Sequence, residues 1–310
     1  MRCLISLLLT VVFLQAGNAG ITSGEKPDSR VSFYVSSGEE KTDLKIFSFF
    51  VLPGEKLPLT ISGSDNVEAK SSMGDVDKVS QKKWTYTAPR QKGVYDLTFT
   101  DAETGEKMLL HIFVMVPASE MKKGVLNGYR IGRYPKEKYK DYKNPAGFIE
   151  VTKENMEVDI TPHFKLKQFL CKQQGEWPKY VVMRPRMLRK LELMLEKLNE
   201  KGVKVKTFVL MSAYRTPYYN KSIGNVKYSR HVFGDAIDLY VDDDGDGRID
   251  DLNRDGKISI KDARVIADVV EQIEKDPKYK EFIGGMGVYN KNSSHTYFVH
   301  VDTRGYRARW

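Results

Sequence analysis

The chain has 310 residues, of which 41% are hydrophobic and 29% charged, and its formal net charge is +9. This length suits about two domains. The sequence contains no motif of a nucleic-acid-binding module, so we do not expect nucleic acid as a partner. The positive charge suits anionic envelope polymers or phospholipid surfaces, although it could equally serve solubility alone.

The first nineteen residues have the pattern of a secretory signal peptide. Arg2 provides a positive start, residues 4–14 are mostly apolar, and Gly17 and Ala19 are small residues at the expected cleavage site. Because the apolar run is short for a bilayer span, we expect cleavage near Ala19, export to the periplasm or cell envelope, and no transmembrane span afterwards. An uncleaved anchor is the alternative. Cleavage would leave Cys171 as the only thiol, without an internal disulfide.

Residues 20–30 are predicted to form a loose polar leader, and residues 31–117 a β-sandwich domain. The second segment has short apolar runs with alternating patterns, separated by turn-forming sequences such as PGE, SGSDN and DAETGE. This spacing is typical of antiparallel sandwiches, and we expect an immunoglobulin-like domain. It contains no catalytic constellation, so it is either a spacer or a module that binds a glycan or another envelope protein.

A basic, tyrosine-rich connector occupies residues 118–160 and shows neither helical nor strand periodicity. Its side chains could contact sugar rings and acidic stem peptides, or simply cover one edge of the domain that follows.

The C-terminal segment, residues 161–310, is predicted to contain both helices and strands. Thr161 and Pro162 have the pattern of a helix start, which makes His163 a packing or capping residue. Residues 185–199 place apolar side chains on one helical face. Residues 205–212 are predicted to be a buried strand. Together with the N-terminal sandwich, this predicts an α+β fold class with a central antiparallel sheet flanked by helices.

Two histidines and one aspartate in this segment have the composition of a zinc site. His231 precedes Asp238 in SRHVFGDAIDLYV, and His300 lies in the strand-like run TYFVHVD near the C-terminus. Two imidazoles and a carboxylate suit Zn²⁺ and leave a fourth position for water. Alternation along the last run places Phe298, His300 and Asp302 on one face of a strand.

Four motifs in order resemble the zinc D-Ala-D-Ala carboxypeptidase-type peptidases, and most closely their murein endopeptidase-like branch. They cover roughly residues 160–310 and are SxYRTPxxN (Ser212 to Asn220), SxHxxGxAxD (Ser229 to Asp238), a glycine-rich turn (Gly284 to Tyr289) and FVHVD (Phe298 to Asp302). The resemblance implies a zinc peptidase with His231, Asp238 and His300 as metal ligands.

The resemblance also implies that Arg215 binds the substrate carboxylate or orients its carbonyl, with Ser229 helping to bind substrate. A planar guanidinium can hold a carboxylate through two parallel hydrogen bonds, although an arginine that braces the loop is the alternative. Many relatives have a histidine or glutamate base shortly before the last zinc histidine, where this chain has Phe298. His295 is therefore the nearest candidate base, and Asp302 could instead orient an imidazole or a water.

A second metal signal lies at residues 242–262, where eight aspartates are crowded together. The residues of its second half occupy the ligand positions of an EF-hand loop with aspartate at the last position, and the segment resembles dockerin-type loops. We expect a structural calcium site formed by Asp251, Asn253, Asp255, Lys257, Ser259 and Asp262. A second site could be formed by Asp242, Asp244, Asp246 and Asp250; a solvated acidic loop is the alternative.

The function expected from these features is that of an exported zinc metallopeptidase that hydrolyses peptidoglycan stem-peptide or crosslink amide bonds. The alternative is a non-hydrolytic, zinc-containing envelope protein that binds peptidoglycan. The sequence does not distinguish a carboxypeptidase from an endopeptidase.

Overall fold

Two β-sheets form the N-terminal half of the computed structural model, which describes residues 28–137 and 142–310. The expected signal peptide and most of the expected leader lie outside these residues. The first sheet has the strand order β2-β1-β4-β7-β6 and the second β3-β9-β8-β5. The strands are β1 Arg30–Ser37, β2 Glu40–Leu44, β3 Ile46–Val51, β4 Lys56–Ser62, β5 Val67–Ser71, β6 Asp75–Ser80, β7 Lys83–Thr87, β8 Gly93–Asp101 and β9 Lys107–Val114.

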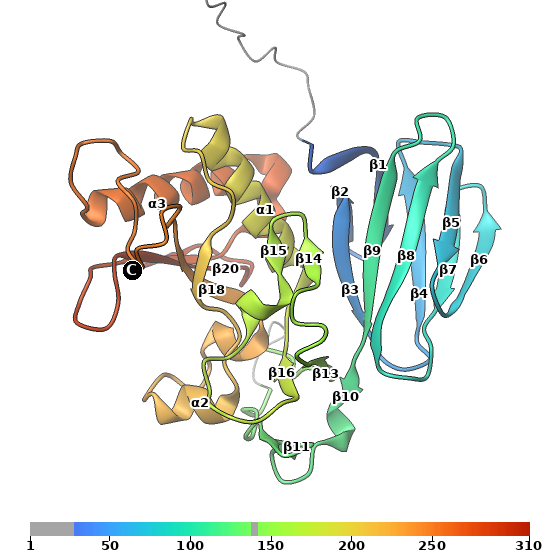
Figure 1. Ribbon diagram of the computed structural model, residues 1–310, viewed down its shortest axis with the longest axis horizontal. Coiled ribbons are helices and arrows are strands. Elements are labelled where there is room, and N and C mark those ends of the chain that lie inside the picture. The colour runs from blue at the N-terminus through green and yellow to red at the C-terminus, as the bar shows by residue number, and fades with distance from the viewer. Residues whose placement is uncertain (1–27, 138–141) are drawn as a thin grey trace, which may run out of the picture.

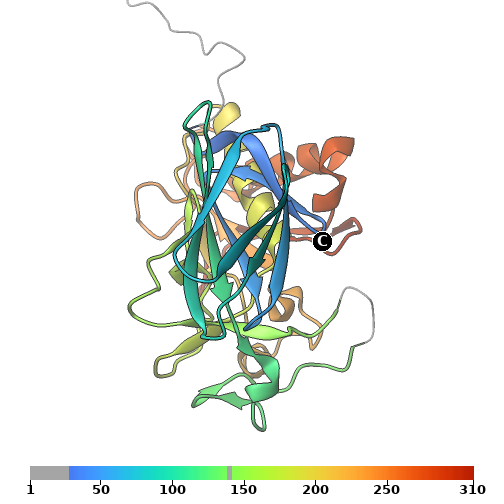
Figure 2. The same cartoon turned by 90° about the vertical axis from the view of Figure 1, so that its right-hand side faces the viewer.

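These two sheets together lie beside the C-terminal half, to its right in Figure 1 and in front of it in Figure 2. Alternation in β8 buries Leu97 and Phe99 while their neighbours are more exposed, as predicted for a strand with one buried face. The β3–β9 pair is parallel, whereas every other pairing in these sheets is antiparallel. The immunoglobulin-like assignment remains a prediction.

Short strands in the connector and directly before it join the two halves. These are β10 Val116–Pro117, β11 Val125–Leu126, β12 Tyr129–Arg130 and β13 Gly147–Val151, with the 3-10 helix η1 Ala118–Glu120. In a three-stranded sheet, β13 pairs with β10 on one side and with β16, Lys179–Val181, on the other. The connector is therefore joined by strand pairing to the segments on both sides of it and is not a separate linker.

Residues 159–165 form a hairpin where the sequence predicted a helix. Strand β14 (Asp159–Thr161) pairs with β15 (Phe164–Lys165), and Pro162 and His163 form the turn between them. The helix prediction was wrong because Ile160, Thr161 and Phe164 are buried in a core that the local capping pattern does not report. His163 is a packing residue, as expected: its Nδ1 lies 2.7 Å from Glu192 Oε2.

A five-stranded sheet with the order β17-β18-β20-β19-β21 is the centre of the C-terminal half. Its strands are β17 Val209–Ser212, β18 Ala236–Tyr240, β19 Gly285–Tyr289, β20 Phe298–Asp302 and β21 Ala308–Arg309. The helices are α1 Pro185–Glu200, α2 Pro217–Ser222, α3 Ile260–Lys275, and the 3-10 helices η2 Leu166–Phe169, η3 Arg230–Phe233 and η4 Pro277–Phe282. Helix α3 packs on β19 and β20, and α1 packs on α3. The mixed α+β class is confirmed.

Helix α1 confirms the predicted helix, with its apolar face buried through Met187, Leu188, Leu191, Leu195 and Leu198. The predicted glycine-rich turn at 284–289 was wrong, since residues 285–289 are strand β19 inside the sheet. Within the part of the chain that the structure describes, no helix is long and apolar enough to cross a membrane.

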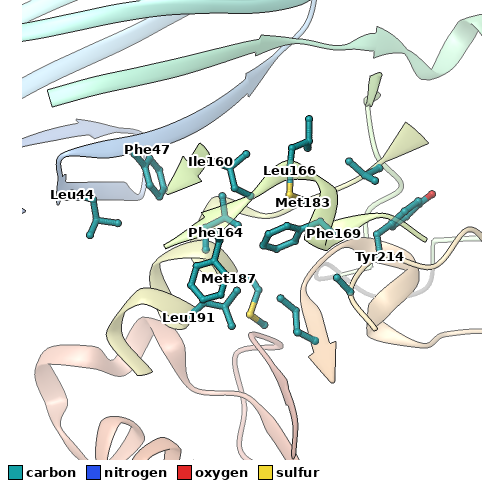
Figure 3. Close-up of a cluster of buried hydrophobic side chains, with 14 of the residues drawn as sticks. Leu44, Phe47, Ile160, Phe164, Leu166, Phe169, Met183, Met187, Leu191 and Tyr214 are labelled. Atoms are coloured by element: carbon teal, nitrogen blue, oxygen red, sulfur yellow. The ribbon is translucent and has the colours of Figure 1, made fainter. Parts of the chain in front are cut away.

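One hydrophobic core extends across both halves. Leu44 and Phe47 of the first half lie beside Ile160 and Phe164 of the hairpin, and this cluster continues to α1 (Figure 3). The Ser48 hydroxyl donates a fully buried hydrogen bond of 2.9 Å to the Ile160 carbonyl. At the edge of this contact, Arg30 of β1 reaches Glu196 of α1 at 2.6 Å.

Candidate metal centre

The three predicted zinc ligands come together on the central sheet. Asp238 of β18 and His300 of β20 are directly paired residues in adjacent antiparallel strands, which places their side chains next to each other. His231 comes from η3, which ends at Gly234 in the left-handed conformation with φ 72°. A Cβ at Gly234 would lie 2.3 Å from the Val182 carbonyl oxygen, so only glycine allows this approach of η3.

The donor atoms of this cluster have the separations of a metal site. His231 Nε2 lies 3.2 Å from His300 Nδ1 and 3.2 Å from Asp238 Oδ1. His300 Nδ1 lies 2.8 Å from Asp238 Oδ1. Ligands at about 2.0–2.2 Å from a tetrahedral zinc ion are about 3.3 Å apart, so these residues fit such an ion with little movement. All three side chains are buried.

The remaining ring nitrogens are held by other groups. His231 Nδ1 lies 2.8 Å from the Ala213 carbonyl oxygen, so it carries the proton and donates it there. His300 Nε2 lies 3.4 Å from Asp302 Oδ2. These contacts turn His231 Nε2 and His300 Nδ1 toward the cluster, as is usual for histidines that bind a metal.

Burial and charge favour the ligand states of His231 and Asp238, whereas the Asp238 and Asp302 carboxylates outweigh burial and raise the pKa of His300. Burial lowers the pKa of His231, which favours the neutral imidazole. Burial alone would raise the pKa of Asp238, but the two nearby imidazoles outweigh it and hold that pKa well below its usual range. Asp238 is therefore an anion at neutral pH.

Arg215 lies directly behind Asp238. Its guanidinium donates to Asp238 Oδ2 at 2.5 Å, and its Nε donates to Ser212 Oγ at 2.7 Å. The side chain is buried, but it still lines the hollow in front of the cluster. The structure thus pairs Arg215, the predicted substrate-binding residue, with a predicted metal ligand. This contact is the one expected of an arginine that positions the site. Ser229 also lines this hollow.

The two candidate bases occupy different places. His295 lies in the loop before β20, where its ring nitrogens are 2.8 Å from the Thr296 carbonyl oxygen and 2.8 Å from Asn292 Nδ2. It does not line the hollow, so the structure does not bring it to the predicted ligands. Asp302 is fully buried, accepts hydrogen bonds from Gly285 and Arg304, and contacts His300. Its contacts are those of a residue that orients an imidazole.

Aromatic side chains form much of the hollow, whose volume is about 440 Å³. The rings of Tyr289 and Phe298 stack at 4.5 Å, and the Trp310 ring lies 5.2 Å from that of His300. Sequence reasoning missed Tyr289 and Trp310. The sequence feature that could have indicated them is the series of glycines in β19. In the structure, a Cβ at Gly287 would lie 2.4 Å from Trp310 Nε1. Glycine at this position makes room for the tryptophan. The other lining residues are Tyr142, Asn225, Val226, Tyr228, Arg230 and Arg304.

The acidic insertion forms two loops between β18 and α3. Carboxylate oxygens of Asp242, Asp244 and Asp250 lie within 4.8 Å of one another. In the second loop, the Asp251 carboxylate accepts hydrogen bonds from the backbone of residues 255 and 256. Asp262 and Ser259 form a capping box at the start of α3. This capping fixes the helix start next to the loop.

Comparison with known proteins identifies one part of the chain. Residues 162–260 match the family model of Peptidase M15, which supports an M15-family peptidase domain in the C-terminal half. The matched segment contains His231 and Asp238 and ends before His300. A search of curated proteins found no significant match.

Proposed function

We propose that this protein is an exported zinc-dependent peptidase that hydrolyses amide bonds of peptidoglycan stem peptides or crosslinks. The observation that carries the proposal is the triangle of donor atoms from His231, Asp238 and His300, with edges of 2.8–3.2 Å. The match to Peptidase M15 supports the same reaction class, since peptidases of this family are typically zinc-dependent.

His231, Asp238 and His300 would hold a zinc ion, which would supply Lewis-acid activation of water and of the scissile carbonyl. The protein residues prepare the site for it. Ala213 and Asp302 hold the imidazoles with the correct nitrogens facing inward, and Arg215 holds the Asp238 carboxylate from the other side. This arrangement fixes the orientation of all three ligands before substrate binds.

The hollow provides the surface that receives the peptide. Arg215 and Ser229 line it, and we assign them to substrate binding together with the Trp310 ring, which is half exposed beside His300. For Arg215 this role is additional to holding Asp238. Asp302 is assigned to orienting His300. His295 is left without a catalytic role, because both of its ring nitrogens are engaged outside the hollow.

Calcium in the acidic insertion is a further part of the proposal. Its support is the approach of three carboxylates in the first loop and the EF-hand spacing of Asp251, Asn253, Asp255, Lys257, Ser259 and Asp262 in the second. Such an ion would neutralise the crowded charges and hold the chain between β18, which carries Asp238, and α3.

A second candidate is a protein that binds peptidoglycan without hydrolysing it. The observation that favours it is Phe298, which lines the hollow near the position where many resembled peptidases have their base. In that case the metal cluster would serve binding and structure only.

Metal analysis followed by muropeptide digestion tests both candidates. Wild type should contain one zinc per chain, His231→Ala and His300→Ala should lose it, and the matched control His295→Ala should keep it. Release of peptide fragments by wild type and the control alone would support the peptidase. Zinc binding with intact muropeptides would favour the binding protein. A folded wild type that takes up no zinc would contradict both.

A further inference from the structure

A second hollow, with a volume of about 680 Å³, lies between the connector and α2. It is strongly basic, and we call it the basic groove. Its lining contains five cationic side chains and no carboxylate: Lys123, Arg130, Arg133, Lys221 and Lys227. All five are exposed. Such a concentration of one sign of charge in a concave site creates a positive potential that attracts anions.

These cations have no carboxylate partner within residues 28–137 and 142–310. Two of them lie over aromatic rings: the Arg130 guanidinium is 4.2 Å from the centre of the Tyr218 ring, and Lys227 Nζ is 5.9 Å from that of Tyr228. Some surface arginines elsewhere are paired with carboxylates. Arg307 and Arg309, for example, both bind Glu271. Among the described residues, no ion pair therefore cancels the positive potential of the basic groove.

The floor of the basic groove is rigid because backbone packs directly on backbone. A Cβ at Gly132 would lie 2.6 Å from the Tyr218 backbone nitrogen, and that nitrogen donates to the Ile131 carbonyl at 2.9 Å. Residues 131 and 132 in turn donate to the Gly124 carbonyl. These contacts fix the connector against the start of α2, so the five cations project from a defined scaffold.

The basic groove adjoins the metal centre. Asn225 lines both hollows. In the loop that follows, Val226 and Tyr228 line the metal-centre hollow, whereas Lys227 lines the basic groove. Pro217, two residues after Arg215, also lines the basic groove. The two hollows are therefore neighbours on either side of the loop at residues 225–228.

We propose that the basic groove binds a carboxylate-bearing segment of the substrate peptide, on one side of the bond that is cut. This inference rests on the proposed peptidase function, because a peptidase substrate continues beyond the reacting bond as a peptide. The cations line a hollow rather than a flat face, which suits a single extended chain better than a bilayer. The aromatic ring of Tyr218 at its wall provides apolar contact for the aliphatic parts of such a chain.

Binding to zinc-free full-length protein tests the groove separately from catalysis. The probes are a fluorescein-labelled tetraglutamate peptide and its tetraglutamine analogue, measured by anisotropy at low and high salt. We expect wild type to prefer the glutamate peptide. The double variant Lys221→Glu/Lys227→Glu should bind it roughly tenfold more weakly, since it replaces attraction by repulsion. The matched control, Lys70→Glu/Lys107→Glu on β5 and β9, makes the same charge change on exposed residues far from the groove.

Three outcomes would overturn the inference: equal binding of the two peptides, equal losses in the groove and control variants, or tighter binding to phosphatidylglycerol vesicles or an oligonucleotide. Failure of the inference and failure of the proposed function give different results. Zinc-loaded protein that cuts muropeptides while the groove variant behaves as wild type contradicts only the groove. Groove-dependent peptide binding without hydrolysis contradicts only the peptidase.

Discussion

Asp238 is the residue on which most contacts of the metal centre converge. One carboxylate oxygen faces the two imidazoles, and the other accepts a hydrogen bond from Arg215. Sequence motifs identified each of these residues but not their connection, because the motifs lie on β18, on β20 and in the loops after β17. Only the pairing of the strands brings them together.

The contact between Arg215 and Asp238 predicts an effect on metal affinity. Arg215→Met should weaken zinc binding by roughly 10–100-fold, because the Asp238 carboxylate loses the group that orients it. Arg215→Lys should restore part of the affinity, since it keeps the charge but not the fork. Competition with a chromophoric chelator measures the affinity. Unchanged zinc affinity with a raised KM would instead assign Arg215 to substrate alone.

Gly287 and Trp310 provide a second test at single residues. A methyl group at Gly287 would displace the Trp310 ring, which is 51% exposed. We therefore expect Gly287→Ala and Trp310→Ala each to raise KM for a muropeptide by roughly three- to tenfold, the value of one aromatic contact. The double variant should be no worse than either single variant. Additive effects in this cycle would show that the two residues act independently.

At the level of elements, the regular parts of the structure follow from sequence periodicity. Only part of the buried strand predicted at 205–212 forms, as the half-buried β17 at Val209–Ser212. Helix α1 and strand β20 lie where their patterns predict them. The hairpin at 159–165 and strand β19 do not. In the first, burial of Phe164 outweighs the helix-capping pattern; in the second, glycines serve close packing inside a sheet. Both depend on residues distant in the chain, which local patterns do not contain.

The position of η3 depends on Gly234, and a pair of glycine variants tests this. Gly234 and Gly202 both have positive φ, of 72° and 81°, but a Cβ at Gly202 would meet nothing within 4 Å. Gly202→Ala should cost about 1 kcal/mol of unfolding free energy for its backbone conformation alone. Gly234→Ala should cost about 2 kcal/mol more, because its methyl group would meet the Val182 carbonyl. Urea denaturation compares them; equal costs would contradict the close contact.

The turn between β14 and β15 is held to α1 by a pH-dependent contact. Hydrogen bonding to the Glu192 carboxylate raises the pKa of His163, more than burial lowers it. The stabilisation is therefore complete below the unfolded pKa of about 6.5 and is lost as pH rises through the higher folded pKa. It should amount to roughly 0.5–1 kcal/mol, because the histidine is partly exposed.

Glu192→Gln should remove this pH-dependent contribution between slightly acidic and slightly alkaline solution. The matched variant Glu157→Gln neutralises an exposed carboxylate paired with Lys167 and should leave it unchanged. Unfolding free energies measured from pH 5.5 to pH 8.5 give the difference between each variant and wild type. A constant difference for Glu192→Gln over this range would exclude the histidine as its source.

At the scale of the whole molecule, the two halves share one core. Phe47 of β3 is fully buried and lies beside the hairpin of the other half (Figure 3). We expect Phe47→Ala to cost about 3–5 kcal/mol and to loosen both halves together. Cys171, buried in the second half, reports this through its rate of thiol labelling, located by peptide mass spectrometry. The fluorescence of Trp84, measured with the other two tryptophans replaced, reports unfolding of the first half. If this fluorescence changes while Cys171 stays protected from labelling, the halves unfold separately.

This shared core has a consequence for the order in which the protein folds. A chain made from its N-terminus completes β9 long before residues 159–198 are available to cover Leu44 and Phe47. Until then, an apolar face of the first half is open to water and to other chains. A nascent chain therefore passes through a stage in which this apolar face is uncovered. The yield of folded protein should therefore depend on how fast the second half is made, or on a chaperone that covers this apolar face until then.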